Sequence, residues 1–219
     1  MNTASRRVPT GLAGLLAALP LLLLWSPLRQ LLEGSMALHM LVELPLLLAS
    51  GWAAGAVLAR HRLPAGLPRQ IDAHGVLGLA FASCVGALWM IPSMLDLSLL
   101  DASVQWVKYG AWWFAGVVLR ASWRRSEPEI AAFFVGNMAW MLATAGLLYQ
   151  DEEQRLCVSY LVDEQAVTGK GLIVLALLLA GLALHRVAAA PRPAAAAAIQ
   201  PGERLTPDAG ERTSGMIRR

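Results

Sequence analysis

The sequence predicts an all-α membrane protein, a polytopic bundle of about six transmembrane helices. Three observations predict this fold class. Hydrophobic residues make up 57% of the 219 residues and charged residues only 15%, so a soluble fold would expose too much apolar surface. Apolar segments of about 20 residues, the length that crosses a hydrocarbon core, recur along the chain. Arginines and acidic residues occupy alternate gaps between these segments.

The charges between the segments predict the topology. Basic residues precede the first and third segments and follow the second, fourth and sixth, so the positive-inside rule places the N-terminus and the C-terminus in the cytoplasm. The net charge of +3 does not indicate a nucleic-acid partner, because the arginines flank apolar spans and orient the chain in a lipid bilayer. We expect a multi-pass protein of a bacterial cell inner membrane. The expected spans are residues 8–26, 36–59, 75–95, 104–119, 130–149 and 168–187.

The ends of the chain require separate interpretation. The first span follows Arg6 and Arg7, as the apolar part of a secretory signal peptide would. No small-x-small cleavage site follows Pro27 and Arg29, which favours an uncleaved membrane anchor. Residues 191–219 are interrupted by proline and glycine and are predicted to form a disordered cytoplasmic tail, so residues 1–190 are the transmembrane domain.

The interior of the spans contains a few polar residues. Glu43 and Lys108 are isolated charges at similar expected depth, and a lone charge at the bilayer centre costs about 2.5 to 3.5 kcal/mol on insertion scales. They are predicted to form an ion pair or to share a hydrogen-bond network, with Tyr109 and Asp163 on the same outer side. Gly51 and Gly55 form a GxxxG pattern that indicates close helix packing.

Methionines and one histidine suggest a metal site on the same side. Met36, His39 and Met40 are spaced i, i+3, i+4, and Met90 and Met94 are spaced i, i+4 in the third span. Thioether and imidazole ligands suit Cu(I), so these five residues are the candidate copper ligands. Two alternatives stay open, since methionine stripes in apolar helices commonly serve packing and His39 would fit equally well in the network of Glu43.

Motifs of common enzymes are missing. There is no Gly-rich phosphate loop, no nucleophile elbow and no HExxH pattern in the sequence, and we therefore expect no catalytic activity. No cofactor other than copper is indicated. A small-solute permease is less favoured because no inverted repeat or broken helix is evident in the pattern.

Three stretches of the chain follow one another in a recognisable order. They are 39–47 (HMLVELPLL), 89–92 (WMIP) with 104–109 (VQWVKY), and 163–173 (DEQAVTGKGLI). In order and spacing they resemble the multi-span assembly factors of caa-type cytochrome c oxidase, often called CtaG-like. The family usually has seven spans and a second histidine where this chain has Glu43. The positions of its other polar residues are occupied here by Met90, Gln105, Lys108 and Tyr109.

The resemblance implies a role in maturing the copper-containing part of a haem–copper oxidase at the outer face of the membrane. The implied partners are cytochrome c oxidase subunits or a copper chaperone. If the role is retained, Met36, His39, Met40, Met90 and Met94 would bind Cu(I) from the periplasmic side. The alternative is a non-catalytic membrane scaffold that has lost the metal site, with Glu43 and Lys108 filling the vacated cavity.

Overall fold

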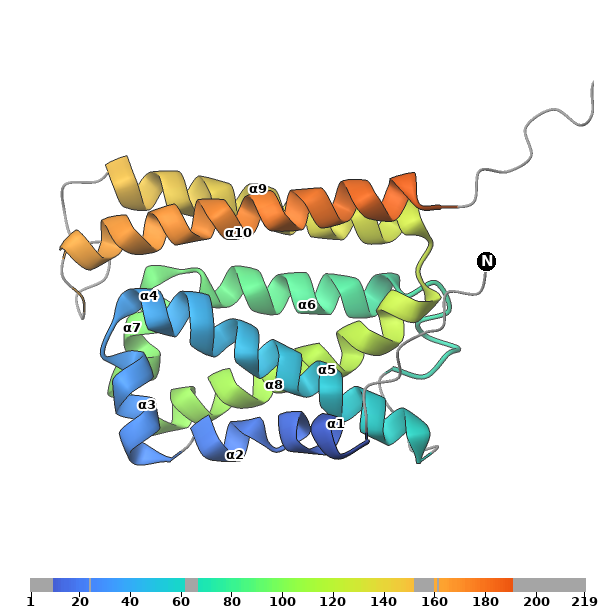
Figure 1. Cartoon of the computed structure of the whole chain (residues 1–219), viewed down its shortest axis with the longest axis horizontal. Coiled ribbons are helices and arrows are strands. Elements are labelled where there is room, and N and C mark those ends of the chain that lie inside the picture. The colour runs from blue at the N-terminus through green and yellow to red at the C-terminus, as the bar shows by residue number, and fades with distance from the viewer. Residues whose placement is uncertain (1–9, 24, 62–66, 152–159, 161, 191–219) are drawn as a thin grey trace, which may run out of the picture. The chain divides into compact units, whose positions relative to one another are not determined.

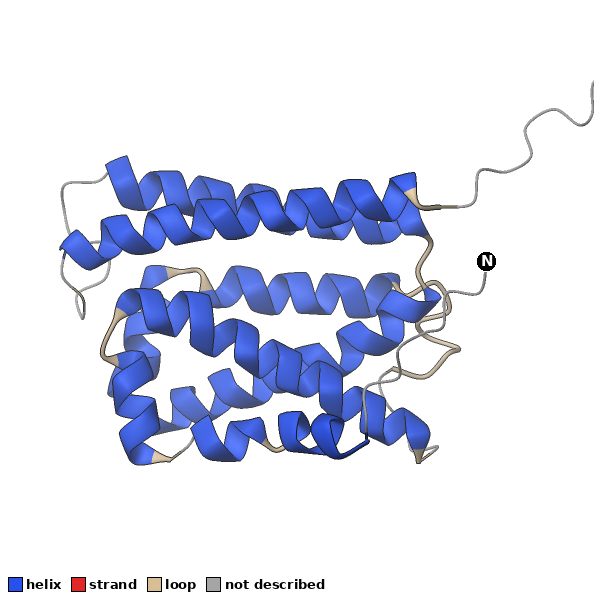
Figure 2. Ribbon diagram, in the orientation of Figure 1, coloured by secondary structure: helices blue, strands red, loops and turns tan. Residues whose placement is uncertain are grey.

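A computed structural model of the chain describes residues 10–23, 25–61, 67–151, 160 and 162–190. Every regular element in these ranges is a helix (Figure 2), as the composition predicts. The tail expected at 191–219 lies outside the described residues. Three helical segments are long and apolar enough to cross a membrane, and a bent pair would make a fourth. The three are Met36–Arg60, Pro128–Asp151 and Glu164–Ala188.

The expected first span, 8–26, is not one helix. Its described part is divided into α1 (Thr10–Ala17), α2 (Leu19–Leu23) and the start of α3 (Ser26–Glu33). Pro20 lacks an N–H group and its ring crowds the carbonyl four residues earlier, which breaks a helix at this point. Pro27 stands in the first turn of α3, a position where proline starts a helix rather than continuing one.

The second span is continuous but contains a turn of π-helix. It comprises α4 (Met36–Leu38), the π-helix η1 (His39–Glu43) and α5 (Leu44–Arg60). The backbone N–H of Leu44 bonds the carbonyl of His39, five residues back. Pro45, which has no N–H, directly follows this bond, so the wider turn accommodates a missing donor. Such π-turns occur frequently at functional sites.

The third expected span, 75–95, is interrupted. It forms α6 (Val76–Trp89) and α7 (Pro92–Leu100), which meet at an angle of 76°. Ile91 precedes Pro92 and has extended backbone angles, φ −73° and ψ 121°, as expected for a residue before proline. The sequence-based expectation of unbroken helices is therefore wrong here, and Met90 and Met94 lie on opposite sides of the bend.

Three longer helices complete the bundle. They are α8 (Ala102–Arg125), α9 (Pro128–Asp151) and α10 (Val162–Ala188). Asp101 caps α8 by accepting a 2.7 Å hydrogen bond from the Ser103 backbone N–H. Figure 1 shows α9 and α10 side by side, and α8 packed on α5 and α6. Gly51 has no Cβ, and this lets α5 and α8 touch. A Cβ at this position would lie 1.9 Å from the Trp113 carbonyl oxygen.

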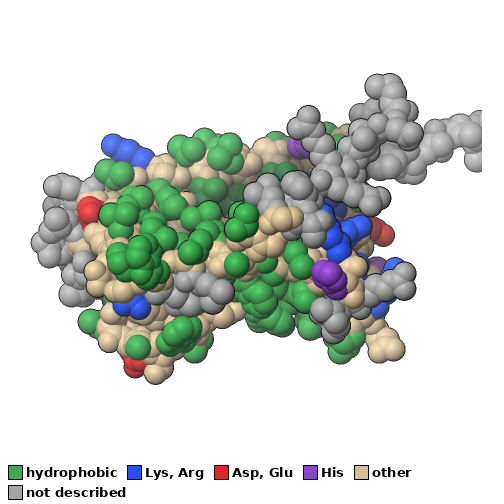
Figure 3. All heavy atoms as spheres, turned by 60° about the horizontal axis from the view of Figure 1, so that its bottom comes forward, with side chains coloured by type: hydrophobic (Ala, Val, Ile, Leu, Met, Phe, Trp, Pro, Cys, Tyr) green, Lys and Arg blue, Asp and Glu red, His purple; other side chains and the backbone are tan. Residues whose placement is uncertain are grey.

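The charged residues divide between the two ends of the helices. One end, on the right in Figure 1, holds the last turns of α5, α8 and α10, and Figure 3 shows Lys, Arg and His side chains toward it beside an apolar middle. We call it the arginine-rich end: Arg60, Arg120, Arg124, Arg125 and Arg186. The opposite, acidic end carries Asp96, Asp101, Asp151 and Glu164. The alternation of charges in the sequence thus gathers most arginines at one end, although Asp72, Glu127 and Glu129 lie there too.

Candidate functional site

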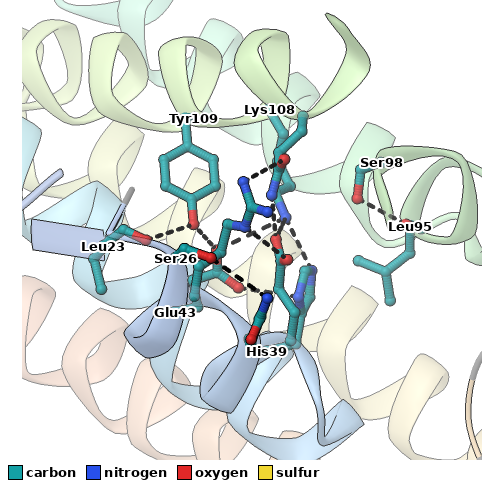
Figure 4. A network of polar contacts seen from close by, with 12 residues as sticks. Leu23, Ser26, His39, Glu43, Leu95, Ser98, Lys108 and Tyr109 are labelled. Atoms are coloured by element: carbon teal, nitrogen blue, oxygen red, sulfur yellow. Dashed lines mark hydrogen bonds and ion pairs between the residues drawn. The ribbon is translucent and has the colours of Figure 1, made fainter. Parts of the chain in front are cut away.

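A group of polar side chains is buried near the acidic end, between α3, the π-helix and α8 (Figure 4). We call these five residues, Glu33, His39, Glu43, Lys108 and Tyr109, the polar centre. His39, Glu43 and Lys108 have no exposed surface at all. A buried charge must be paired and hydrogen-bonded to be tolerated, and the contacts of each member show how this is achieved.

Lys108 lies in the middle of the polar centre. Its Nζ is 3.3 Å from Glu33 Oε1 and 3.7 Å from Glu43 Oε1. The same nitrogen is 3.5 Å from His39 Nε2. The ammonium group therefore faces two carboxylates from different helices and one imidazole. This is the ion pair between Glu43 and Lys108 that their isolated positions in the sequence predict.

Glu43 is held by both of its oxygens. Its Oε2 lies 3.0 Å from His39 Nδ1, an i, i+4 pair across the π-turn. Its Oε1 accepts a hydrogen bond from the Tyr109 hydroxyl, which also lies 3.5 Å from the Leu23 carbonyl oxygen. Figure 4 shows the Tyr109 hydroxyl pointing from α8 toward Glu43. The Tyr109 hydrogen bond and the Lys108 ammonium offset the cost of burying this carboxylate, while Oε2 approaches Nδ1 without the geometry of a hydrogen bond.

Glu33 connects the polar centre to the exterior. Its side chain is 13% exposed, and its Oε2 lies 3.5 Å from Nε of Arg29, which is 34% exposed. Gln105 donates a 2.6 Å hydrogen bond to Glu33 Oε1 and accepts one of 3.3 Å from Arg29 Nη1. The Tyr160 hydroxyl bonds the backbone carbonyl of Glu33 at 2.9 Å, which fixes the end of α3.

The local sequence explains why these side chains converge. Gln105, Lys108, Tyr109 and Trp112 are spaced i, i+3, i+4 and i+7, so they form one face of α8, and all four are buried. That face meets the π-helix, which presents His39 and Glu43 one turn apart. The buried face of α8 therefore has a polar part, which is formed by Gln105, Lys108 and Tyr109, and an apolar part, which is formed by the Trp112 ring.

The polar centre has the outline of a cation site. Glu33, His39 and Glu43 offer ligand atoms that all lie within 4.8 Å of one another. The Lys108 ammonium lies 3.3 to 3.7 Å from the same three side chains. The two carboxylates already face the cations Lys108 and Arg29, so an added divalent ion would bring further positive charge into a buried place.

The donor set also differs from the one predicted for copper. Two carboxylates and an imidazole suit zinc and similar borderline ions, whereas Cu(I) favours sulfur ligands. The polar centre therefore does not fit Cu(I).

The five predicted copper ligands are divided among three places. His39 belongs to the polar centre, with both ring nitrogens next to Glu43 and Lys108. Met36 and Met40 are buried in an apolar cluster against which Met90 packs. Met94 packs against a different cluster, because the bend between α6 and α7 separates it from Met90.

The structure describes most residues of the predicted polar network. Glu43, Lys108 and Tyr109 meet, while the side chain of Asp163, at the start of α10, lies outside the described residues. Glu33 and Arg29 were not predicted, although their i, i+4 spacing was a signal. Gln105 was noted only through the family resemblance.

Comparison of the chain with models of protein families, with curated proteins and with solved structures finds no match. The functional interpretation therefore depends on the geometry above and on the motifs of the sequence.

Proposed function

We propose that the chain is a non-catalytic assembly factor for a haem–copper cytochrome c oxidase, and that its polar centre contains the Lys108 ammonium where a metal-binding relative would hold an ion. The position of Lys108 Nζ, within 3.7 Å of all three candidate ligand groups, is the observation that carries this proposal. The assembly role itself rests on the three motifs that resemble the CtaG-like family. Oxidase subunits are the proposed partners.

A cellular experiment tests the assembly role. Deleting the gene in the source organism should lower the copper signal of the oxidase, measured by electron paramagnetic resonance, while leaving its haem content less affected. Wild-type protein should restore the signal, and so should a Lys108→Arg variant that keeps the positive charge. Unchanged oxidase copper in the deletion strain would contradict the assembly role.

We also propose a membrane topology that goes beyond the three or four helices long and apolar enough to cross. We propose six crossings, with α1 and α2 as an interrupted first crossing and α8 as the fourth. The arginine-rich end would then face the cytoplasm together with both termini, according to the positive-inside rule, and the polar centre would lie toward the outer face of a bacterial inner membrane.

Cysteine labelling in intact cells tests this orientation. In a Cys84→Ser/Cys157→Ser background, a membrane-impermeant maleimide should modify Asp101→Cys but not Arg124→Cys. The opposite pattern would invert the topology, and labelling of both positions would contradict six crossings.

One observation favours a second candidate function, the handling of Cu(I) by methionines. Met36, Met40 and Met90 share one apolar cluster, and thioethers are suitable Cu(I) ligands. Competition with a chromophoric Cu(I) chelator distinguishes the two candidates. Stoichiometric binding that a Met36→Leu/Met40→Leu variant loses and the matched Met94→Leu variant keeps would favour copper handling. If the wild type bound no more Cu(I) than the Met36→Leu/Met40→Leu variant, the metal-free proposal would be favoured.

A further inference from the structure

An elongated apolar cavity lies beside the polar centre, since Met40, Leu44 and Trp112 belong to its lining. It has a volume of about 610 Å³ and is bounded by α5, α6, α8, α9 and α10. Its volume is within the range of about 300 to 1,000 Å³ that small-molecule sites occupy. Nearly all lining side chains are apolar, among them Leu48, Ala82, Met138 and Leu175. The proposed function makes no use of this cavity.

The shape of the cavity limits what can fill it. Its lining residues on the second span extend from Met40 in the π-helix to Ala56 in α5, a distance of about 24 Å at the α-helical rise of ~1.5 Å per residue. A cavity of this length with an almost wholly apolar lining suits an extended alkyl chain, because such a chain has no polar groups that burial would leave unpaired.

Arg120 supplies a positive charge at one end of this apolar slot. It lines the cavity, and its guanidinium carbon lies 5.7 Å from the centre of the Trp52 ring. Among the residues that the structure describes, none forms a hydrogen bond or ion pair with the Arg120 side chain. Arg120 also lies within the electrostatic influence of Arg60 and Arg124. A half-buried guanidinium among other cations favours an anion, because its five N–H donors match phosphate oxygens.

We propose that this cavity binds an anionic phospholipid, with one acyl chain in the slot and the phosphate group on Arg120. The apolar lining recognises the chain, and Arg120 at the end of the slot recognises the headgroup. The α9–α10 pair contacts the remaining helices mainly through α4, the π-helix and α6, so the lipid chain fills the interval between this pair and α5. The bound lipid is thus a structural ligand of the bundle.

Fluorescence quenching tests the headgroup contact. Trp52 and Trp112 both line the cavity, so a phosphatidylglycerol with dibrominated acyl chains should quench tryptophan fluorescence of the detergent-solubilised full chain in a saturable manner. Dibrominated phosphatidylcholine should quench only weakly. Arg120→Gln should weaken phosphatidylglycerol binding by about tenfold, whereas Arg124→Gln, four residues further along α8 and exposed, should change it less than about twofold. Arg120→Lys, which keeps the charge, should bind better than Arg120→Gln and serves if the glutamine variant does not fold.

A second pair of variants tests the position of the acyl chain. Ala82→Phe inserts a ring into the slot and should abolish the saturable quenching, while Ala87→Phe, on an exposed face of α6 outside the lining, should leave it unchanged. Equal quenching by the two lipids, or equal loss in the Arg120→Gln and Arg124→Gln variants, would overturn the phosphate contact. Retained quenching in Ala82→Phe would overturn the cavity as the site.

Discussion

Within the part of the chain that the structure describes, carboxylates are buried in two places, which stabilise them in different ways. In the polar centre Glu43 is fully buried and contacts the side chains of His39, Lys108 and Tyr109. Near the arginine-rich end Asp72 is 3% exposed. It accepts hydrogen bonds from the Ser122 hydroxyl at 2.6 Å and from the Leu77 backbone N–H at 3.1 Å, while Arg125 Nη1 is 3.9 Å away.

The difference follows from the partners that each place provides. Asp72 lies in the turn before α6, where a backbone N–H and a serine hydroxyl are available and where the cation, with a side chain 24% exposed, reaches solvent. Glu43 lies inside a helix whose own N–H groups are occupied, so side chains from α8 must supply its partners. A buried ammonium is the strongest of these partners, but it is also the one whose loss leaves the most uncompensated charge.

The largest expected effect is the loss of the Lys108 charge. Lys108→Met should lower the free energy of unfolding by about 3 to 5 kcal/mol, because Glu43 remains fully buried without its cation. Unfolding by SDS in mixed micelles measures this change in free energy. The matched control is Lys170→Met at an exposed position, whose free energy of unfolding should lie within about 0.5 kcal/mol of that of the wild type.

Adding Glu43→Gln to Lys108→Met should recover part of that loss, because the double variant buries one carboxylate fewer. Losses that simply add in the double variant would show that Glu43 and Lys108 are not coupled.

An intermediate effect is expected from the Tyr109 hydroxyl. Tyr109→Phe removes the hydrogen bond to Glu43 but keeps the ring and the charges, so the free energy of unfolding should fall by about 1.5 to 3 kcal/mol. The same mixed-micelle unfolding measures the change. In the Glu43→Gln background the cost of Tyr109→Phe should shrink, and an undiminished cost would mean that the hydroxyl acts on another partner, such as the Leu23 carbonyl.

The smallest effect is expected at Asp72. Ser122→Ala removes one hydroxyl donor and should cost about 1.5 kcal/mol, the low end of the range for a hydrogen bond to a charged group, since the Leu77 N–H remains and Arg125 is nearby. Thermal unfolding in detergent compares the loss of stability in Ser122→Ala with the loss in Lys108→Met. A loss as large as that of Lys108→Met would contradict the contrast between the two places.

Much of the architecture follows from the sequence, because apolar length and flanking charge dominate in a membrane. The helices at 36–60, 128–151 and 164–188 and the contact between Glu43 and Lys108 are examples, since a charge inside an apolar helix needs a partner. The GxxxG pattern also predicted close packing of the second span, and the structure shows that α8 is the helix it contacts there.

Other features depend on tertiary structure and were less accessible. Glu33 and Arg29 lie in a stretch between two expected spans, where exposed charges are ordinary, so only the folded α3 shows that they close the polar centre. The bend at Ile91 and the π-turn before Pro45 both accompany prolines, and hydropathy averages over a span do not record where a proline interrupts it. The division of the methionines follows from that bend.

Metal retention by the purified protein tests the role of Lys108 most directly. Wild type and Lys108→Ala should be incubated with Zn²⁺, passed through a desalting column and assayed by mass spectrometry for bound zinc. The account predicts no retained zinc in wild type and about one ion per chain in Lys108→Ala, lost again in Lys108→Ala/His39→Ala. Retention of zinc by the wild type, abolished by His39→Ala, would contradict the claim that Lys108 occupies the cation position.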